Sequence, residues 1–215
     1  MTDTDRSTRL EAACTALPLV AILRGLRPEE SVEIAQTLYD AGFRLIEIPL
    51  NSPEPFDSIA RVRAALPADA LIGAGTVTTL DAVARLDEIG ADLVVMPHAD
   101  TAVIAQAKAA GMICIPGIAT PTKAYAALHA GADALKVFPA ELVDAKVVKA
   151  IRTILPVGTR LFPVGGIAPD TMTDFLAAGA AGFGLGSALY KPGDDAATVA
   201  AKAGAFTKAW AREAG

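Results

Sequence analysis

The stretch AGFRLIEIPL, residues 41–50, contains the pattern that decides the fold. Gly42 follows an amphipathic segment, and glycine is typical of the position just beyond a helix C-terminus. The apolar run that begins at Leu45 is short and rich in isoleucine and leucine, as the buried strands of parallel sheets are. The stretch therefore predicts a helix end followed by a buried strand.

The same pattern, a glycine at a helix end followed by a short apolar run, recurs along the chain. An AG or IG pair precedes a new strand five times, with the glycines at positions 42, 90, 111, 131 and 179. Eight apolar runs are predicted as strands, at residues 19–23, 45–50, 71–74, 93–96, 113–116, 134–138, 161–164 and 182–185. Helical patterns fill the intervals, so the chain alternates strand and helix.

Strands that alternate with helices predict a parallel sheet. Eight such units with right-handed crossovers favour an α/β fold closed into a (β/α)8 TIM barrel, with residues 1–215 forming a single domain behind a short N-terminal helix. An open doubly wound sheet is the alternative. It is less favoured because no G-x-G-x-x-G turn follows the first strand and the chain has no Walker-type phosphate loop.

Composition excludes several classes of protein. Of the 215 residues 53% are hydrophobic and 20% charged, the net charge is −5, and no basic run is present, which argues against nucleic acid and anionic membranes as partners. Cys14 and Cys114 do not form a disulfide framework and suit a reducing compartment. The polar first ten residues resemble no signal peptide, and no apolar stretch reaches the roughly 18 residues of a membrane span. We expect a soluble cytoplasmic protein.

Two charged residues interrupt predicted strands. In RLIEIPL, Ile46 and Ile48 take the helix-facing side of the pleat, so Glu47 should point into the barrel. In DALKVFPA, Leu135 and Val137 likewise face the helices, which turns Lys136 inward. Of the eight lysines in the chain, only Lys136 lies in a predicted strand.

Burial of Lys136 should lower the pKa of its amine, so that the neutral form needed to attack a ketone is available near neutral pH. The resulting iminium is an electron sink that allows the carbon–carbon bond beta to it to break without a metal. Glu47 would then move protons, directly or through a bound water. The structural alternative is a buried Glu47–Lys136 ion pair that only fills the barrel. The positions of both residues inside predicted strands favour catalysis.

Further residues at predicted strand ends suit an anionic substrate. Arg24 ends the first strand, where a guanidinium can bind a carboxylate, and Thr76 follows the glycine-rich end of the third. The seventh and eighth strands are followed by glycine-containing turns, and backbone N–H groups in these two loops commonly bind phosphate in such barrels. The candidate phosphate-binding residues are Gly165, Gly166, Gly186 and Ser187.

The sequence gives no sign of a metal site. His98 and His129, the only histidines, belong to neither an H-x-H nor an H-E-x-x-H grouping. We therefore expect no metal.

These motifs together resemble the bacterial 2-keto-3-deoxy-6-phosphogluconate and 6-phosphogalactonate aldolase family, across nearly the whole chain from Leu17 to Trp210. The phrases that carry the resemblance are LPLVAILRG, EIPLNSP, GAGTV, PGIATPTKA, LKVFPA, PVGGI and GLGSALY, in the family's order.

The resemblance implies that Lys136 forms the Schiff base and Glu47 transfers protons. It also implies that Arg24 and Thr76 contact the keto-acid end of the substrate, and that Gly166 and Ser187 hold its phosphate. The substrate would be a phosphorylated keto-deoxy sugar acid, the products pyruvate and glyceraldehyde 3-phosphate, and the assembly a homotrimer without cofactor.

The resemblance also narrows the substrate. Gluconate members usually have Thr-Arg-Thr, with a ligand-binding arginine, where this chain has Pro49, Leu50 and Asn51, so we expect the galactonate epimer, with the gluconate epimer or both as the alternative. A phosphosugar isomerase or epimerase that uses Glu47 as base, and a non-catalytic phosphosugar-binding barrel, are less favoured.

Overall fold

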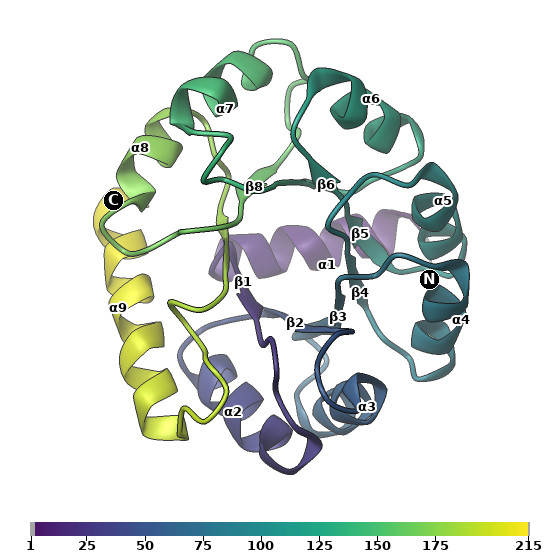
Figure 1. The fold of residues 1–215 in the computed structure, drawn as a ribbon, viewed down its shortest axis with the longest axis vertical. Helices are drawn as coiled ribbons and strands as arrows, with labels where there is room; N and C mark the ends of the chain where they lie inside the picture. Colours follow the sequence, from purple (N-terminus) through teal and green to yellow (C-terminus); the bar gives the residue numbers. More distant parts are fainter. Residues whose placement is uncertain (1–2, 215) are drawn as a thin grey trace.

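The computed structural model describes residues 3–214, and the side chains of residues 7–213, as a ring of parallel strands surrounded by helices (Figure 1). The elements in chain order are α1 (Asp3–Ala16), β1 (Leu19–Ile22), α2 (Pro28–Asp40), β2 (Leu45–Pro49), α3 (Pro55–Ala65), β3 (Leu71–Gly75), α4 (Leu80–Glu88), β4 (Leu93–Val95), α5 (Thr101–Ala109), β5 (Ile113–Ile115), β6 (Gly117–Ile118), α6 (Pro121–His129), β7 (Leu135–Val137), α7 (Ala145–Arg152), β8 (Leu161–Pro163), α8 (Met172–Ala177), β9 (Phe183–Leu185) and α9 (Ala196–Ala214). The predicted alternation of strands and helices is confirmed.

The strands form two parallel sheets, one with the order β5-β4-β3-β2-β1-β9 and one with the order β6-β7-β8. The first and last strands of the chain pair, from Leu19↔Phe183 to Ala21↔Leu185, which is barrel-like connectivity. The hydrogen-bonded ladder is not continuous around the ring. It is interrupted at Pro116, which lies between β5 and β6 and has no N–H to donate. The β8 end is linked to the β9 segment by the bridge Val164↔Gly184 and by a hydrogen bond from the Ala181 N–H to the Leu161 carbonyl.

Helix α1 covers one open end of the ring, behind the strands in Figure 1. Its Leu10 and Ala13 are buried in one cluster with inward-facing strand residues. These are Val20, Leu45, Leu71, Leu93, Val95, Ile113, Ile115, Ala134 and Phe162. The predicted N-terminal helix is therefore present and closes the apolar floor of the barrel.

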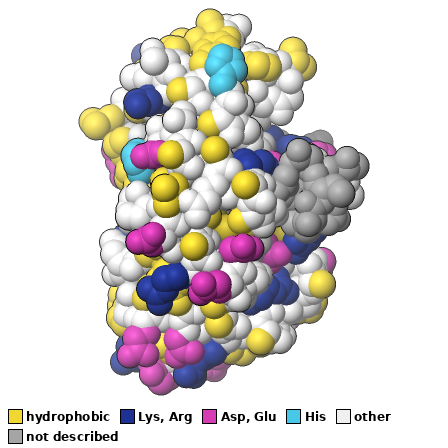
Figure 2. Space-filling view, turned by 90° about the vertical axis from the view of Figure 1, so that its right-hand side faces the viewer, with side chains coloured by type: hydrophobic (Ala, Val, Ile, Leu, Met, Phe, Trp, Pro, Cys, Tyr) yellow, Lys and Arg dark blue, Asp and Glu magenta, His cyan; other side chains and the backbone are white. Residues whose placement is uncertain are grey.

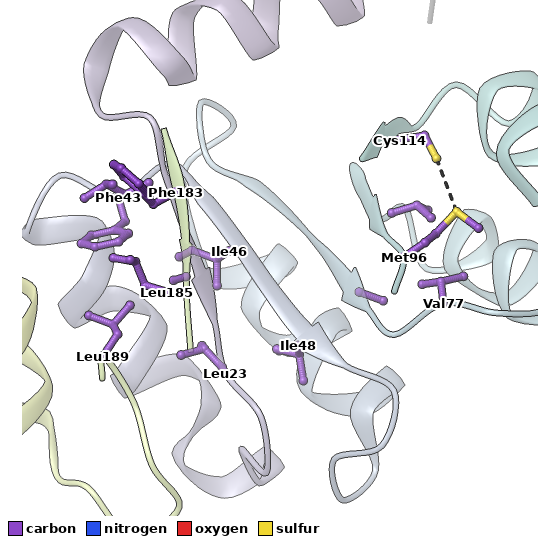
Figure 3. Close-up of a cluster of buried hydrophobic side chains, with 14 of the residues drawn as sticks. Leu23, Phe43, Ile46, Ile48, Val77, Met96, Cys114, Phe183, Leu185 and Leu189 are labelled. Atoms are coloured by element: carbon purple, nitrogen blue, oxygen red, sulfur yellow. Dashed lines mark hydrogen bonds between the residues drawn. The ribbon is translucent and has the colours of Figure 1, made fainter. Parts of the chain in front are cut away.

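The opposite faces of the strands pack against the surrounding helices. Figure 3 shows Phe43, Ile46, Phe183 and Leu185 gathered in this outer layer, all of them fully buried. The glycines predicted to follow helices have positive φ angles, between 68° for Gly90 and 102° for Gly42. They reverse the chain direction at helix ends without the steric cost that another residue would have.

Paired charges fix the N-terminal ends of the strands. The carboxylate of Asp92 accepts hydrogen bonds from Nη1 of Arg9 at 2.6 Å and from Nη1 of Arg63 at 2.7 Å, and also from the backbone N–H of Ile72. On the neighbouring side, Asp133 pairs with Lys108 and accepts the N–H of Cys114. Each aspartate stands just before a strand and ties it to a helix.

The outer face carried by α4, α5 and α6 has charged and apolar side chains interspersed (Figure 2). Larger exposed apolar side chains occur at Tyr125, Leu142, Val147, Ile154 and Val157, in and around α6 and α7. No helix within residues 3–214 combines the length and apolar character that crossing a membrane requires.

Candidate active site

Lys136 is the middle residue of β7 and points into the ring. Its Cα partners in the neighbouring strands are Gly117 and Phe162, and its side chain is 6% exposed. Leu135 and Val137 belong to the outer cluster that packs against the helices, which confirms the predicted orientation. The ring of Phe138 lies 4.8 Å from the Lys136 Nζ atom.

Glu47 is the middle residue of β2 and is more deeply buried, at 1% exposure. Its carboxylate lies directly against the backbone of Gly75, where a Cβ atom would come within 1.5 Å of Oε2. The glycine at the end of β3 therefore makes room for the Glu47 carboxylate.

The two groups have pKa values displaced in opposite directions. Burial raises the pKa of Glu47 to about 7, although the nearby positive charges of Lys136 and Arg24 oppose the shift. Burial also lowers the pKa of Lys136, and the charge of Arg24 adds to that effect while Glu47 opposes it. Both shifts increase the share of the neutral form near pH 7.

Glu47 and Lys136 do not form the buried ion pair that a purely structural role would require. No salt bridge within 4.0 Å joins these two described residues, and the buried Oε2 of Glu47 has no hydrogen-bond partner in the described part of the chain. Both line a small cavity of about 10 Å³ at the centre of the ring. That volume is close to the smallest that holds one water molecule, so a single water between the groups is sterically feasible.

Above this small cavity lies an open pocket of about 410 Å³. Six of the predicted site residues line it: Arg24, Lys136, Gly165, Gly166, Gly186 and Ser187. Ile22, Lys136 and Val164 line both spaces, so Lys136 stands at the boundary between the pocket and the Glu47 cavity. The pocket thus brings together all but two of the predicted residues.

Thr76 is not among the residues that line either cavity. It follows β3 directly and has a φ angle of 57°, in the left-handed region that a β-branched residue rarely adopts. Backbone strain of this kind clusters at functional sites because the surrounding structure must hold it. The structure places Thr76 at the C-terminal end of β3, outside the lining of the pocket.

Arg24 is held at the mouth of the pocket by the next loop. Its Nη1 atom donates to Oδ1 of Asn51 at 2.6 Å, and the N–H of Gly25 donates to the hydroxyl of Ser52 at 2.9 Å. The NSP segment after β2 therefore supports the Arg24 loop. This contact gives Asn51 a defined role at the position where gluconate members of the resembled family have threonine.

Several pocket residues were missed from the sequence. They are Phe138, Glu141, Tyr190, Lys191 and Pro192. The Glu141 carboxylate packs against Gly165, whose Cβ would meet Oε2 at 2.1 Å. Tyr190 and Lys191 belong to the same segment as Gly186 and Ser187, and their position just after a strand end was the available signal.

The structure contains no group of three or more His, Cys, Asp or Glu side chains arranged to hold a metal ion, as far as the described residues extend.

Comparison with known proteins agrees with the site. Residues 10–201 match the family described as "Aldolase: KDPG and KHG aldolase". The chain is 48% identical to the "Probable 2-dehydro-3-deoxy-6-phosphogalactonate aldolase" of Rhizobium meliloti (strain 1021), covering 86% of this chain and 88% of the relative. It is 44% identical to the 2-dehydro-3-deoxy-6-phosphogalactonate aldolase of Escherichia coli (strain K12), over 93% and 97% of the two chains.

A solved structure described as "Native KDPGal structure" superimposes with a TM-score of 0.91 at 43% identity, covering 92% of this chain and 96% of the other. The resemblance to the galactonate branch is thereby confirmed. The chain belongs to the KDPG and KHG aldolase family.

Proposed function

We propose that the chain is a class I aldolase that cleaves 2-dehydro-3-deoxy-6-phosphogalactonate to pyruvate and D-glyceraldehyde 3-phosphate. One observation carries the proposal: a buried lysine and a buried glutamate, with pKa values displaced toward neutrality, lie beneath a pocket lined by glycine turns. Lysine and glutamate together supply the nucleophile and the proton carrier that the reaction needs.

Lys136 is the nucleophile. Its neutral Nζ adds to the C2 ketone of the substrate, and loss of water from the adduct gives a protonated imine. The C4 hydroxyl then loses its proton, the C3–C4 bond breaks, and the electron pair moves into the imine to form an enamine. Glyceraldehyde 3-phosphate leaves, C3 of the enamine is protonated, and water releases pyruvate from Lys136.

Glu47 is the group that moves these protons. With a pKa of about 7, its carboxyl can both accept a proton from the C4 hydroxyl and return one to C3 near neutral pH. The cavity it shares with Lys136 has room for one water, which would carry the proton over the gap between them.

The two ends of the substrate would have separate anchors. Arg24 presents a guanidinium at the mouth of the pocket for the carboxylate. Gly165 and Gly166, with Gly186 and Ser187, would bind the phosphate through backbone N–H groups and the serine hydroxyl.

The epimer preference rests on the loop after β2. Asn51 bonds Arg24 in this chain, and no arginine from that loop reaches toward the sugar, which sets it apart from the gluconate pattern. We favour the galactonate epimer, with activity on the gluconate epimer as the alternative.

Two measurements test the proposal. Pyruvate release is assayed from the two phosphorylated epimers side by side, and the galactonate epimer should have the higher kcat/KM. Borohydride reduction in the presence of pyruvate should attach the three-carbon unit to Lys136, located by peptide mass spectrometry. Absence of the adduct would exclude the Schiff base, and activity retained in Lys136→Met would favour an isomerase that uses Glu47 alone.

We further propose that residues 1–215 form one (β/α)8 barrel domain that works in the cytoplasm as a homotrimer, without metal or cofactor. The exposed apolar side chains around α6 and α7, among them Leu142 and Val157, support burial against another subunit. Sedimentation should give about three times the 22.0 kDa chain mass, and activity should survive treatment with a chelator.

A further inference from the structure

A buried tyrosine beside the pocket is bonded to a distant helix. Tyr190, in the loop after β9, is 2% exposed and lines the pocket. Its hydroxyl donates to Oε1 of Glu30, in the first turn of α2, at 2.9 Å. A hydrogen bond between a phenol and a carboxylate is among the stronger kinds in proteins. It joins two segments that lie 160 residues apart in the chain.

A second contact joins the same two segments. Pro192 lies so close to Gly25 that a Cβ atom at position 25 would come within 2.6 Å of the proline Cγ. Gly25 also has a φ angle of 83°, which favours glycine, so the contact depends on this residue in two ways. We refer to the Tyr190–Glu30 hydrogen bond and the Gly25–Pro192 contact as the loop clamp.

The loop clamp connects the two proposed substrate anchors. Arg24 directly precedes Gly25 in the loop between β1 and α2. Ser187 lies in a turn whose first carbonyl, that of Gly186, accepts the backbone N–H of Tyr190 at 3.0 Å. The tyrosine side chain therefore holds the turn that carries Ser187 against the helix that follows Arg24.

We infer that Tyr190 and Glu30 are positioning residues that fix the distance between the carboxylate anchor and the phosphate anchor. This inference rests on the proposed function. If it holds, the loop clamp selects a 2-keto sugar acid phosphorylated at its far end over the unphosphorylated one. The phosphorylated substrate must reach both anchors at once, whereas the unphosphorylated one uses only the Arg24 end, so only the former depends on their spacing.

Helix stabilisation alone does not account for the tyrosine. The N-terminus of α2 is already capped by Arg27 and Glu30, because Glu30 accepts both the backbone N–H and the guanidinium of Arg27. Loss of the Tyr190 hydroxyl leaves that capping box in place. What it removes is the connection between α2 and the Ser187 turn.

The test compares the phosphorylated substrate with its unphosphorylated counterpart, 2-dehydro-3-deoxygalactonate. In Tyr190→Phe, the ratio of the two kcat/KM values should fall about tenfold, the effect of losing one good hydrogen bond, chiefly through a higher KM for the phosphorylated substrate. Trapping of pyruvate on Lys136 by borohydride should stay within about twofold of the wild-type rate, because pyruvate carries no phosphate.

Three further variants separate positioning from a general structural role. Glu30→Ala should reproduce the fall in the ratio, whereas Glu30→Gln keeps an acceptor oxygen for the phenol and should restore the wild-type ratio. Tyr39→Phe is the matched control. Tyr39 lies at the far end of the same helix, and the change removes its hydrogen bond of 2.9 Å to the carboxylate of Asp69. It should leave the ratio unchanged.

Two outcomes would overturn the loop clamp, provided that the wild-type protein still forms the pyruvate adduct. One is an equal loss of kcat/KM for both substrates in Tyr190→Phe. The other is an unchanged ratio in both Tyr190→Phe and Glu30→Ala. A wild-type protein that forms no adduct at all would instead overturn the proposed function, and the inference with it.

Discussion

Charged side chains have opposite surroundings at two levels of the barrel: a lower level at the N-terminal ends of the strands, with Asp92 and Asp133, and an upper level further along them, with Glu47 and Lys136. At the lower level, Asp92 contacts two arginines and a backbone N–H, and Asp133 contacts Lys108 and the N–H of Cys114. Further along the strands, Glu47 and Lys136 are buried, and the Oε2 atom of Glu47 has no hydrogen-bond partner within the described chain.

The difference separates stabilisation from catalysis. A carboxylate with several partners stabilises the fold, whereas one that is buried with an unpaired oxygen costs free energy and persists only if function requires it. Changes at the lower level should therefore reduce stability and leave chemistry intact. Changes at the upper level should abolish or slow the chemistry and leave the protein folded.

The largest effect is expected from Lys136→Met, which replaces the amine with an unbranched apolar chain of similar length. Without the nucleophile, kcat/KM for cleavage should fall by about four orders of magnitude or more. Steady-state assays of pyruvate release measure the loss. Lys149→Met, at an exposed position on α7, is the matched control and should retain wild-type activity. Circular dichroism should show both variants folded.

Glu47→Gln should have the next largest effect. The amide fits the space beside Gly75 and cannot transfer a proton, so kcat should fall about 10²- to 10⁴-fold. Lys136 remains, and borohydride should still trap pyruvate on it, although more slowly. A variant that cleaves substrate at the wild-type rate would remove Glu47 from the mechanism.

Asp92→Asn tests the lower level. The change leaves Arg9 and Arg63 without their shared counter-charge, and the free energy of unfolding should fall by about 2–3 kcal/mol. Urea denaturation at pH 7 measures the difference, with the exposed Asp87→Asn on α4 as the control. The folded fraction should keep wild-type kcat and KM. A selective loss of kcat at unchanged stability would contradict the division between the two levels.

Sequence periodicity predicted most of the fold because each strand and each helix end has a local physical cause. The alternation of Ile46, Glu47 and Ile48 determines which side chain enters the barrel, and a glycine such as Gly42 marks the helix end by its positive φ. The interruption of the ladder was not predicted. Pro116 was included in a strand, and its missing N–H divides that strand into β5 and β6.

The candidate site was predicted where a residue's environment follows from its own strand. Glu47, Lys136 and the glycine turns meet this condition, and the structure brings them to one end of the barrel. The Tyr190–Glu30 bond and the fit of Gly75 around Glu47 depend on segments far apart in the chain. No local pattern reveals such a contact, because neither partner is unusual in its own neighbourhood.

The smallest effect expected is a pH-dependent gain in stability in Glu47→Gln. The pKa of Glu47 rises from its ordinary 4.5 to about 7 on folding, so the folded state holds the proton more tightly than the unfolded state. Stability is full below about pH 4.5 and declines as the pH rises through 7, because the unfolded chain ionises freely while the buried group does not. Glutamine does not titrate and escapes this decline.

The stability advantage of the glutamine variant over wild type should therefore grow by about 1–2 kcal/mol between pH 5 and pH 8. Urea denaturation at both pH values measures it, and taking the difference between the two cancels any constant cost of burying the amide. The exposed Glu88→Gln on α4 should show no such growth. If the stability difference between Glu47→Gln and wild type were the same at pH 5 and pH 8, the Glu47 carboxyl would titrate near its ordinary value. Burial of charge at the upper level would then destabilise the fold no more than it does at the lower level.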